Sequence, residues 1–402
     1  MYLPDRILVA PSGFKESLDA IEVADAIAAG VRRALPGVHV STLPVPDGGE
    51  GTVSILAATT GGVTTETVVT GPVGLPVTAT WVMLGGSGPR TAVIEMAAAA
   101  GLSLVPHDLR DPGETTTRGV GELIAAALDA GADRIVVGCG DSGTCDGGVG
   151  ALAALGALIL DDDEVLPDGG RHLHRVSRLD LSGLHPRLSE VPVELACNAT
   201  NVLCGPRGVA RVFGPQKGAT PHQVSHLERG LERWADVLRR DGVGAPGGLD
   251  LRTGAGTGAS GGLGAGLAGG IGAVLRSRFD ALLTPDLLGA DLDAEIAAAD
   301  LVITAEGAID FQTPRGKVPA EVARRAGLAG VPVMAIAGSL GRGAPDVHDI
   351  GIGAVTSIMA VPMPLADAVA QGRRLLVEAT ERSMRMLQLG AAVSRRAGDR
   401  VA

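Results

Sequence analysis

Short apolar runs alternate with segments of helical periodicity along much of this chain, and this alternation limits the folds open to it. Residues 6–10 (RILVA) have the character of a buried strand. From Ser17, the expected N-cap, apolar residues recur at helical spacing until Pro36 and Gly37 end the pattern. A helix pattern followed by a strand pattern returns at residues 120–137, 292–304 and 319–336. Strands that alternate with helices favour a doubly wound α/β domain, with helices on both faces of a parallel sheet.

Two stretches differ from this pattern. Residues 63–95 contain three short alternating strand patterns separated by Gly-Pro turns, which suits an antiparallel or mixed sheet. Residues 161–192 are polar, and the Asp-Asp-Asp-Glu run among them indicates a solvated loop. We therefore expect a discontinuous doubly wound domain and a second α/β domain inserted in it. The expected ranges are 1–65, 113–150 and 285–402 for the first domain, and 66–112 and 151–284 for the second.

Charge and composition exclude several classes of protein. The 402 residues carry a formal net charge of -11, and only 2% of them are aromatic. A nucleic-acid or anionic-membrane surface would need a basic face, and platforms that stack bases need aromatic rings. The four cysteines form no Cys-x-x-Cys pair, and no apolar run reaches the ~20 residues of a membrane span. We expect a cytoplasmic protein with buried, reduced thiols that binds neither nucleic acid nor membrane.

Lysine and asparagine are almost absent from this chain. Its only lysines are Lys15, Lys217 and Lys317, and its only asparagines are Asn198 and Asn201. Each of the three lysines stands in a loop that contains glycine. Since arginine does not reproduce the slender point charge of lysine, these three positions are candidates for binding an anion.

The first two candidate loops follow strand patterns near the N-terminus. Residues 10–17 carry Lys15 into a helix start, and the N–H groups of a helix start attract anions. In PVPDGGEGT, Asp47 and Glu50 stand beside Gly48 and Gly49, which let a ligand approach the backbone. The carboxylates suit a general base or a metal ligand. For Glu50, a charge that complements the helix dipole is an equally simple explanation.

The next two candidate loops are polar turns. In GDSGTCDGG, Ser142 and Thr144 could cradle phosphate oxygens, although a capped turn explains them as well. In ACNATNVLC, Asn198 and Asn201 suggest specific hydrogen bonding to a ligand. Turn formation is the alternative, and it explains one asparagine better than two.

The fifth loop follows the strand pattern at residues 301–304. It carries Glu306 and Asp310, and Lys317 comes shortly after them. Two Gly-x-Gly-x-x-Gly patterns also occur within residues 256–269, but no strand pattern precedes them. Close helix packing explains these glycines better than a dinucleotide site, so an NAD-dependent dehydrogenase is the weaker alternative.

Taken in order, these loops resemble a known family. The segments are APSGFKESL, PVPDGGEGT, GDSGTCDGG, ACNATNVLCGP, VFGPQKGAT, GASGGLGAG, DLVITAEGAIDFQTPRGKVP and AIAGSLG. Together they span nearly the whole chain, and the chain is identified as a divergent member of the bacterial type I glycerate kinase family. The resemblance implies two α/β domains, one of them Rossmann-like and one with a mixed sheet, and an active site in the cleft between them.

The resemblance also implies a reaction, in which ATP and Mg²⁺ are used to phosphorylate D-glycerate at the 2-hydroxyl and give 2-phosphoglycerate. Asp47 would accept the hydroxyl proton, and Lys15 and Lys217 would balance phosphate or carboxylate charge. Glu306 and Asp310 would hold Mg²⁺, with Asp310 also counted as catalytic, and Arg315 or Lys317 would reach the substrate carboxylate. The remaining residues expected to bind substrate or phosphate are Ser12, Gly48, Gly49, Glu50, Ser142, Thr144, Asn198 and Asn201.

Five positions depart from the family pattern. They are Ser12, Asp141, Cys145, Asn198 and Ala305. Because some of these changes alter charge, the acceptor could be another hydroxy acid or an amino acid of a specialised pathway. A descendant that binds nucleotide or ligand without catalysis is a further alternative. The sequence also leaves a homodimer open.

Overall fold

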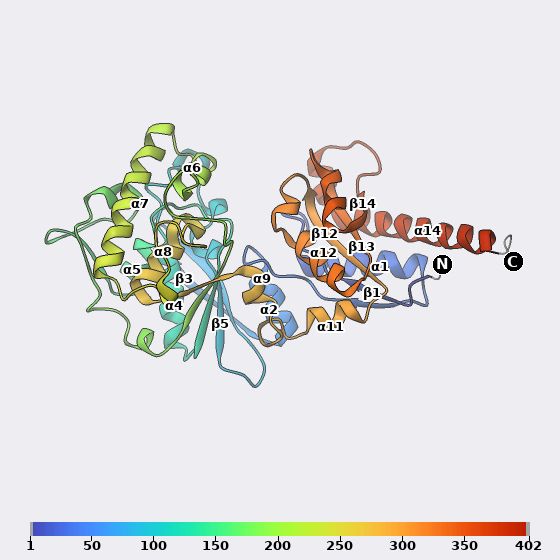
Figure 1. Ribbon diagram of the computed structural model, residues 1–402, viewed down its shortest axis with the longest axis horizontal. Helices are drawn as coiled ribbons and strands as arrows, with labels where there is room; N and C mark the ends of the chain where they lie inside the picture. The colour runs from blue at the N-terminus through green and yellow to red at the C-terminus, as the bar shows by residue number, and fades with distance from the viewer. Residues whose placement is uncertain (1–2, 399–402) are drawn as a thin grey trace. The chain divides into compact units, whose positions relative to one another are not determined.

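The computed structural model describes residues 3–398, and the chain divides into two compact units (Figure 1). Unit 1 comprises Met1–Asp47 and Ala290–Ala402, and unit 2 comprises Gly48–Gly289. Residues 1, 2 and 399–402 of the expected first domain lie outside the described residues. Within the described residues, no helix is both long and apolar enough to cross a membrane.

Unit 1 contains a five-stranded sheet in which every pair of neighbouring strands is parallel. In spatial order its strands are β14 (Ile352–Ser357), β13 (Val333–Leu340), β12 (Leu301–Ile309), β1 (Arg6–Val9) and β2 (His39–Thr42). Its helices are α1 (Ala20–Ala34), α11 (Leu292–Ala297), α12 (Val318–Ala329), α13 (Leu365–Ala370) and α14 (Gly372–Gly398). The sheet confirms the predicted doubly wound architecture.

Successive side chains along the strands of unit 1 point to opposite faces of the sheet, and both faces are buried. Ile7 and Ile303 belong to one apolar cluster with α1 and α14. Leu8 and Val302 point to the opposite face, because successive side chains alternate, and they are also fully buried. The sequences of β1 and β12 are therefore continuous apolar runs, as expected for a parallel sheet covered on both sides.

The strand order of unit 1 also fixes where a ligand can bind. The chain runs from β1 to the edge strand β2, and it later returns to β12 on the other side of β1. The order reverses between β1 and β12, and ligands of open α/β sheets bind beyond the carboxyl ends of the strands at such a point. The loops after β1 and β12 carry Lys15 and Asp310, so two predicted loops meet at this reversal.

Unit 2 contains a mixed six-stranded sheet. Its order is β11 (Val274–Ser277), β10 (Val193–Cys197), β6 (Arg134–Gly138), β5 (Thr91–Glu95), β4 (Pro76–Met83) and β3 (Val63–Thr70). The first four strands are parallel, whereas β4 pairs antiparallel with both β5 and β3. A smaller antiparallel sheet comprises β7 (Leu158–Asp161), β8 (Glu164–Val165) and β9 (Arg178–Asp180). The predicted mixed sheet is thus confirmed.

The helices of unit 2 surround one large apolar core. They are α2 (Thr52–Thr60), α3 (Ala97–Ala100), α4 (Arg118–Asp129), α5 (Val149–Ala154), α6 (Val209–Phe213), α7 (Pro221–Asp241), α8 (Ala259–Ile271), α9 (Arg278–Leu282) and α10 (Pro285–Leu288). The glycines of α8 allow close packing. A Cβ on Gly264 would lie 2.2 Å from the Gly256 carbonyl oxygen, and a Cβ on Gly266 would lie 2.3 Å from the Gly147 carbonyl oxygen. Packing therefore accounts for these glycines without a dinucleotide.

Two expectations about chain organisation are wrong. Residues 113–150, expected in the first domain, lie in unit 2, because β6 pairs with β5 and β10. Residues 48–65 and 285–289 also lie in unit 2. The N-cap of α1 is Asp19, which forms a capping box with Glu22, whereas the Ser17 hydroxyl donates to the Val369 carbonyl.

Candidate active site

The loop after β1 is held against β12 by Ser12. Its backbone N–H and its hydroxyl both donate to the carbonyl oxygen of Ala305, at 2.9 and 3.0 Å. Further along, a Cβ on Gly307 would lie 3.6 Å from the backbone nitrogen of Lys15. The predicted residue Ser12 thus positions the loop, and the loop brings the exposed Lys15 to the carboxyl end of β12.

Glu306, Asp310 and Lys317, the charged residues of the fifth predicted loop, form a cluster in unit 1. The Lys317 ammonium lies 2.7 Å from a Glu306 carboxylate oxygen and 4.0 Å from one of Asp310. The Thr313 hydroxyl donates to Glu306 at 3.2 Å. Burial raises the pKa of Glu306, and the neighbouring Lys317 lowers it in part. The two carboxylates therefore already share one positive charge.

These two carboxylates fit a hydrated magnesium ion. Mg²⁺ commonly takes one or two protein carboxylates and keeps several waters and substrate phosphate oxygens. No group of three or more His, Cys, Asp or Glu side chains suited to a metal occurs within residues 3–398. Glu306 and Asp310 are thus compatible with a metal that arrives with its nucleotide, and less so with a permanently held ion.

Arg315 is exposed beside this cluster. Its guanidinium carbon lies 5.5 Å from the centre of the Phe311 ring, a cation–π arrangement. Arg315 and Lys317 were both expected to reach a substrate carboxylate. In this structure Lys317 is paired with Glu306, and Arg315 lies over an aromatic ring.

In unit 2, the glycines of two predicted loops meet at the carboxyl end of β6. A Cβ on Gly138 would lie 2.6 Å from the Gly48 carbonyl oxygen, and one on Gly140 would lie 2.9 Å from the Gly49 Cα. The boundary between the two units falls between Asp47 and Gly48, so Asp47 directly precedes this contact.

The acid that meets the N-terminal turn of α2 is Glu95, which the sequence analysis missed. A carboxylate oxygen of Glu95 accepts from the Val53 N–H at 2.6 Å, while Glu50 is exposed in the turn before the helix. Glu95 is the last residue of β5. The same rule that selected the other loops, a polar residue where a buried strand ends, could have identified it.

Lys217 is the most buried charged group among the predicted residues, with 3% of its surface exposed. Its ammonium donates to the Ser142 hydroxyl and to the Thr144 carbonyl oxygen, both at 2.7 Å. Burial is the largest influence on its pKa and lowers it from 10.5. The structure thus joins two predicted loops, VFGPQKGAT and GDSGTCDGG, through one buried lysine.

The two asparagines have local roles. The Asn198 side-chain oxygen accepts from the Thr200 N–H at 3.0 Å and from its hydroxyl at 2.8 Å, which is an Asx turn. The Asn201 N–H donates to the Asn198 carbonyl oxygen, and its own carbonyl oxygen accepts from Gly258. Turn formation therefore accounts for Asn198, and the backbone of Asn201 ties the loop to the start of α8.

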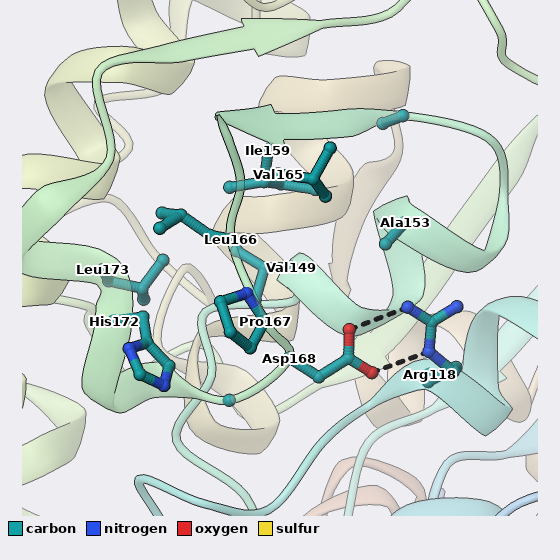
Figure 2. A pocket seen from close by; sticks show the side chains of 12 residues that line it. Arg118, Val149, Ala153, Ile159, Val165, Leu166, Pro167, Asp168, His172 and Leu173 are labelled. Atoms are coloured by element: carbon teal, nitrogen blue, oxygen red, sulfur yellow. Dashed lines mark hydrogen bonds and ion pairs between the residues drawn. The ribbon is translucent and has the colours of Figure 1, made fainter. Parts of the chain in front are cut away.

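A pocket elsewhere in unit 2 contains none of the predicted residues. Figure 2 shows its apolar lining beside the ion pair of Arg118 and Asp168, whose closest atoms are 2.7 Å apart. The carboxylate also accepts from the Thr116 hydroxyl. Because both charges are already paired, this pocket offers little polar chemistry to a ligand.

Comparison with known proteins identifies the family. Residues 7–388 match the glycerate kinase family. The chain belongs to this family. It is 47% identical over 365 residues to the glycerate kinase of Bacillus subtilis strain 168, covering 90% of this chain and 92% of that one. It is 43% identical over 355 residues to the glycerate 2-kinase of Escherichia coli K12, covering 88% and 90%.

A solved structure agrees with the family assignment. The crystal structure of a protein named glycerate kinase 2 from Salmonella typhimurium LT2 superposes with a TM-score of 0.79 and is 42% identical, covering 96% of this chain and 99% of that chain. The predicted glycerate kinase resemblance is thus confirmed, and the chain is a kinase that acts on a small molecule.

Proposed function

We propose that this glycerate kinase family member transfers the γ-phosphoryl group of ATP to the 2-hydroxyl of D-glycerate, giving 2-phosphoglycerate. The observation that carries the proposal is the buried ammonium of Lys217, which donates to the Ser142 hydroxyl and the Thr144 carbonyl oxygen. The chain that holds it is similar over most of its length to a relative named glycerate 2-kinase. In phosphoryl transfer a protein mainly positions its reactants and balances charge, and these residues suit that task.

Four of the predicted residues have chemical roles in the proposal. Asp47 accepts the proton of the attacking hydroxyl, and Lys15 balances phosphate charge. Glu306 and Asp310 hold Mg²⁺, which neutralises charge on the phosphates when it is bound. To hold the metal, Glu306 must break its ion pair with Lys317.

The departures from the family pattern favour glycerate as the acceptor, because most of them are structural. Ser12 donates to the carbonyl of Ala305, which is a fully buried residue of β12. Cys145 is fully buried, and Asn198 forms an Asx turn that aspartate can also form. Asp141 differs from these departures, because its side chain is exposed.

An ADP-release assay tests this function. Purified protein with ATP and Mg²⁺ is offered D-glycerate, L-glycerate, lactate, serine and glycolate, and the phosphorylated carbon is assigned by ³¹P NMR. We expect D-glycerate to give the highest kcat/KM and 2-phosphoglycerate as product. A higher kcat/KM for another acid would identify that acid as the acceptor in place of D-glycerate. If ATP binds but no acid gives ADP release, the result would support a protein that binds nucleotide without catalysis.

The role of Asp47 has its own test. Asp47→Asn preserves the side-chain shape but removes the base, so turnover should fall by roughly 100-fold or more while ATP binding persists. Near-normal turnover in this variant would refute the assignment of Asp47 as the base.

A further inference from the structure

Glu95 is a buried acid that joins the end of a strand to the start of a helix in unit 2. It is the last residue of β5, and 8% of its surface is exposed. A carboxylate oxygen of Glu95 accepts from the Val53 N–H of α2 at 2.6 Å. Burial of a carboxylate is unfavourable unless hydrogen bonds compensate it. A buried acid at this place therefore indicates that the contact with α2 matters to the protein.

The start of α2 has no acceptor from its own N-cap side chain. The N-cap is Gly51, which has φ 93° and makes no side-chain hydrogen bond to the helix. The first N–H groups of a helix lack partners within the helix, and a polar side chain at the N-cap usually accepts from one of them. Glycine has no side chain for this, but it suits the left-handed backbone. Glu95 thus supplies the missing acceptor from β5, and its charge complements the positive end of the helix.

The loop before α2 is also fixed within unit 2. The Gly48 N–H donates to the hydroxyl of the buried Thr52 at 3.0 Å, and the Thr52 N–H donates to the Gly49 carbonyl oxygen at 3.2 Å. A Cβ on Gly48 would lie 3.3 Å from the backbone nitrogen of Cys139, so this end of the loop packs on the segment after β6. Residues 48–53 are therefore held at one end by the segment after β6 and at the other end by Glu95.

Asp47 immediately precedes this fixed loop. The peptide bond that joins it to Gly48 is planar, and the two Cα atoms across such a bond are about 3.8 Å apart. The orientation of Gly48 therefore limits where the Asp47 carboxylate can lie. A general base must come within about 2.6–3.2 Å of the group whose proton it accepts, and a displacement of about 1 Å can lower a rate about 100-fold.

We infer that Glu95 is a positioning residue for phosphoryl transfer, because by holding the start of α2 it fixes the loop that orients Asp47 as the base. The inference rests on the proposed function, since it needs Asp47 in that role, and it adds a residue outside the predicted loops. The alternative is a structural role, in which Glu95 stabilises α2 and leaves the chemistry unchanged. Positioning differs from stabilisation because it predicts a loss of kcat that depends on Asp47.

Three variants separate positioning from stabilisation. Glu95→Ala removes the acceptor, and Glu95→Gln keeps an acceptor oxygen at the same length without the charge. Glu122→Ala is the matched control, because the Glu122 carboxylate also accepts from a backbone N–H at 2.6 Å, that of Thr70 at the end of β3. Glu122 lies in the same unit and belongs to no proposed site. Steady-state kinetics with D-glycerate and ATP gives kcat and both KM values, and thermal melts give stability.

Glu95→Ala should lower kcat roughly 10- to 100-fold and keep both KM values within about threefold, because the substrates bind but the base is misplaced. Glu95→Gln should keep kcat within about fivefold of the wild type. Glu122→Ala should lower the melting temperature and keep kcat within about twofold. The positioning role would be overturned by a folded Glu95→Ala with wild-type kcat, by a Glu95→Gln as slow as Glu95→Ala, or by an equal loss of kcat in Glu122→Ala.

A double-mutant cycle with Asp47→Asn gives the most specific result. Once the base is absent its position no longer matters, so Glu95→Ala should lower the residual turnover of Asp47→Asn by less than about twofold. An equal fold-loss in both backgrounds would show that Glu95 acts independently of Asp47, and it would overturn the inference. If Glu95→Ala does not fold, Glu95→Asp replaces it with the same expected results, because it keeps the carboxylate but is shorter by one methylene group.

Failure of the positioning role and failure of the proposed function are distinguishable. If the wild-type protein phosphorylates D-glycerate and Glu95→Ala keeps its kcat, the positioning role is wrong and the function stands. If the wild-type protein phosphorylates no acid, the proposed function is wrong, and the positioning role fails with it because there is no base to orient.

Discussion

The charged cluster of unit 1 and the buried Lys217 of unit 2 stabilise a lysine ammonium in different ways. In unit 1, the Lys317 ammonium is paired with Glu306 and approaches Asp310, and these side chains are 15 to 30% exposed. In unit 2, Lys217 is 3% exposed and donates to two neutral oxygens, the Ser142 hydroxyl and the Thr144 carbonyl.

This difference suggests different ligands for the two regions. A paired cluster that is partly open to water can exchange one cation for another at modest cost, which suits a metal that enters with its nucleotide. A buried ammonium held in place by fixed neutral partners is preorganised for a ligand of one shape and charge. We therefore expect unit 1 to control the magnesium requirement and unit 2 to control the choice of acceptor acid.

The largest effect is expected for Lys217→Met, which removes the buried charge at similar length. Since a preorganised donor to an anion contributes strongly in a site closed to water, kcat/KM for D-glycerate should fall roughly 100- to 1000-fold. Steady-state kinetics with circular dichroism as a folding control measures this. A folded variant with kcat/KM within about fivefold of the wild type would remove Lys217 from the site.

A smaller effect is expected for Glu306→Gln, which should raise the magnesium concentration for half-maximal rate roughly 10- to 100-fold. The reason is that one of two carboxylates is lost from the proposed metal site. Asp293→Asn removes another carboxylate of unit 1, one that pairs with Arg325, and serves as the control. If both variants show the wild-type magnesium dependence, the metal assignment fails.

The pH dependence of Lys217 offers a third test. Because burial lowers its pKa below 10.5, the unfolded chain binds this proton more tightly than the folded chain. Its contribution to stability should therefore rise as pH climbs from the lowered pKa towards 10.5. Binding of D-glycerate needs the ammonium, so over the same window it should weaken roughly tenfold per pH unit.

Thermal melts and calorimetry across that window, on wild type and on Lys217→Met, check both slopes. The neighbouring groups Cys145 and Asp146 remain in both proteins, so the difference between the two profiles reports the lysine together with its electrostatic coupling to these groups. A wild-type binding profile parallel to that of Lys217→Met would show that another group controls the pH dependence.

The smallest effect is expected for Asp19→Ala, which removes the capping box of α1 in unit 1. Loss of an N-cap should lower the free energy of unfolding by about 1 kcal/mol. Ligand affinities should not change, because α1 contributes none of the proposed binding residues. Chemical denaturation measures the first quantity, and a change in D-glycerate affinity would show that the two units are coupled.

The sequence indicated the grouping of charged residues in unit 1 more directly than the contacts of Lys217 in unit 2. Glu306, Asp310 and Lys317 lie within one short stretch after a strand, so local spacing already brings them together. The contact of Lys217 with Ser142 and Thr144 joins residues more than 70 positions apart, and only the fold creates it.

The wrong domain assignment of β6 and the missed conformation of Ser260 have the same physical origin, which is that both depend on tertiary structure. The strand pattern of β6 suits either sheet, and pairing with β5 and β10 decides where it lies. Ser260 stands in a glycine-rich segment whose pattern indicates packing alone. Its left-handed backbone becomes visible only in three dimensions.

A crossed calorimetric titration tests most directly whether the two regions bind different ligands. D-Glycerate and ADP with Mg²⁺ are titrated separately into wild type, Lys217→Met and Glu306→Gln. The expected result is that Lys217→Met weakens D-glycerate binding and leaves ADP with Mg²⁺ unchanged, while Glu306→Gln does the reverse. Equal losses of both ligands in each variant, or the opposite assignment, would contradict the division of roles between the two units.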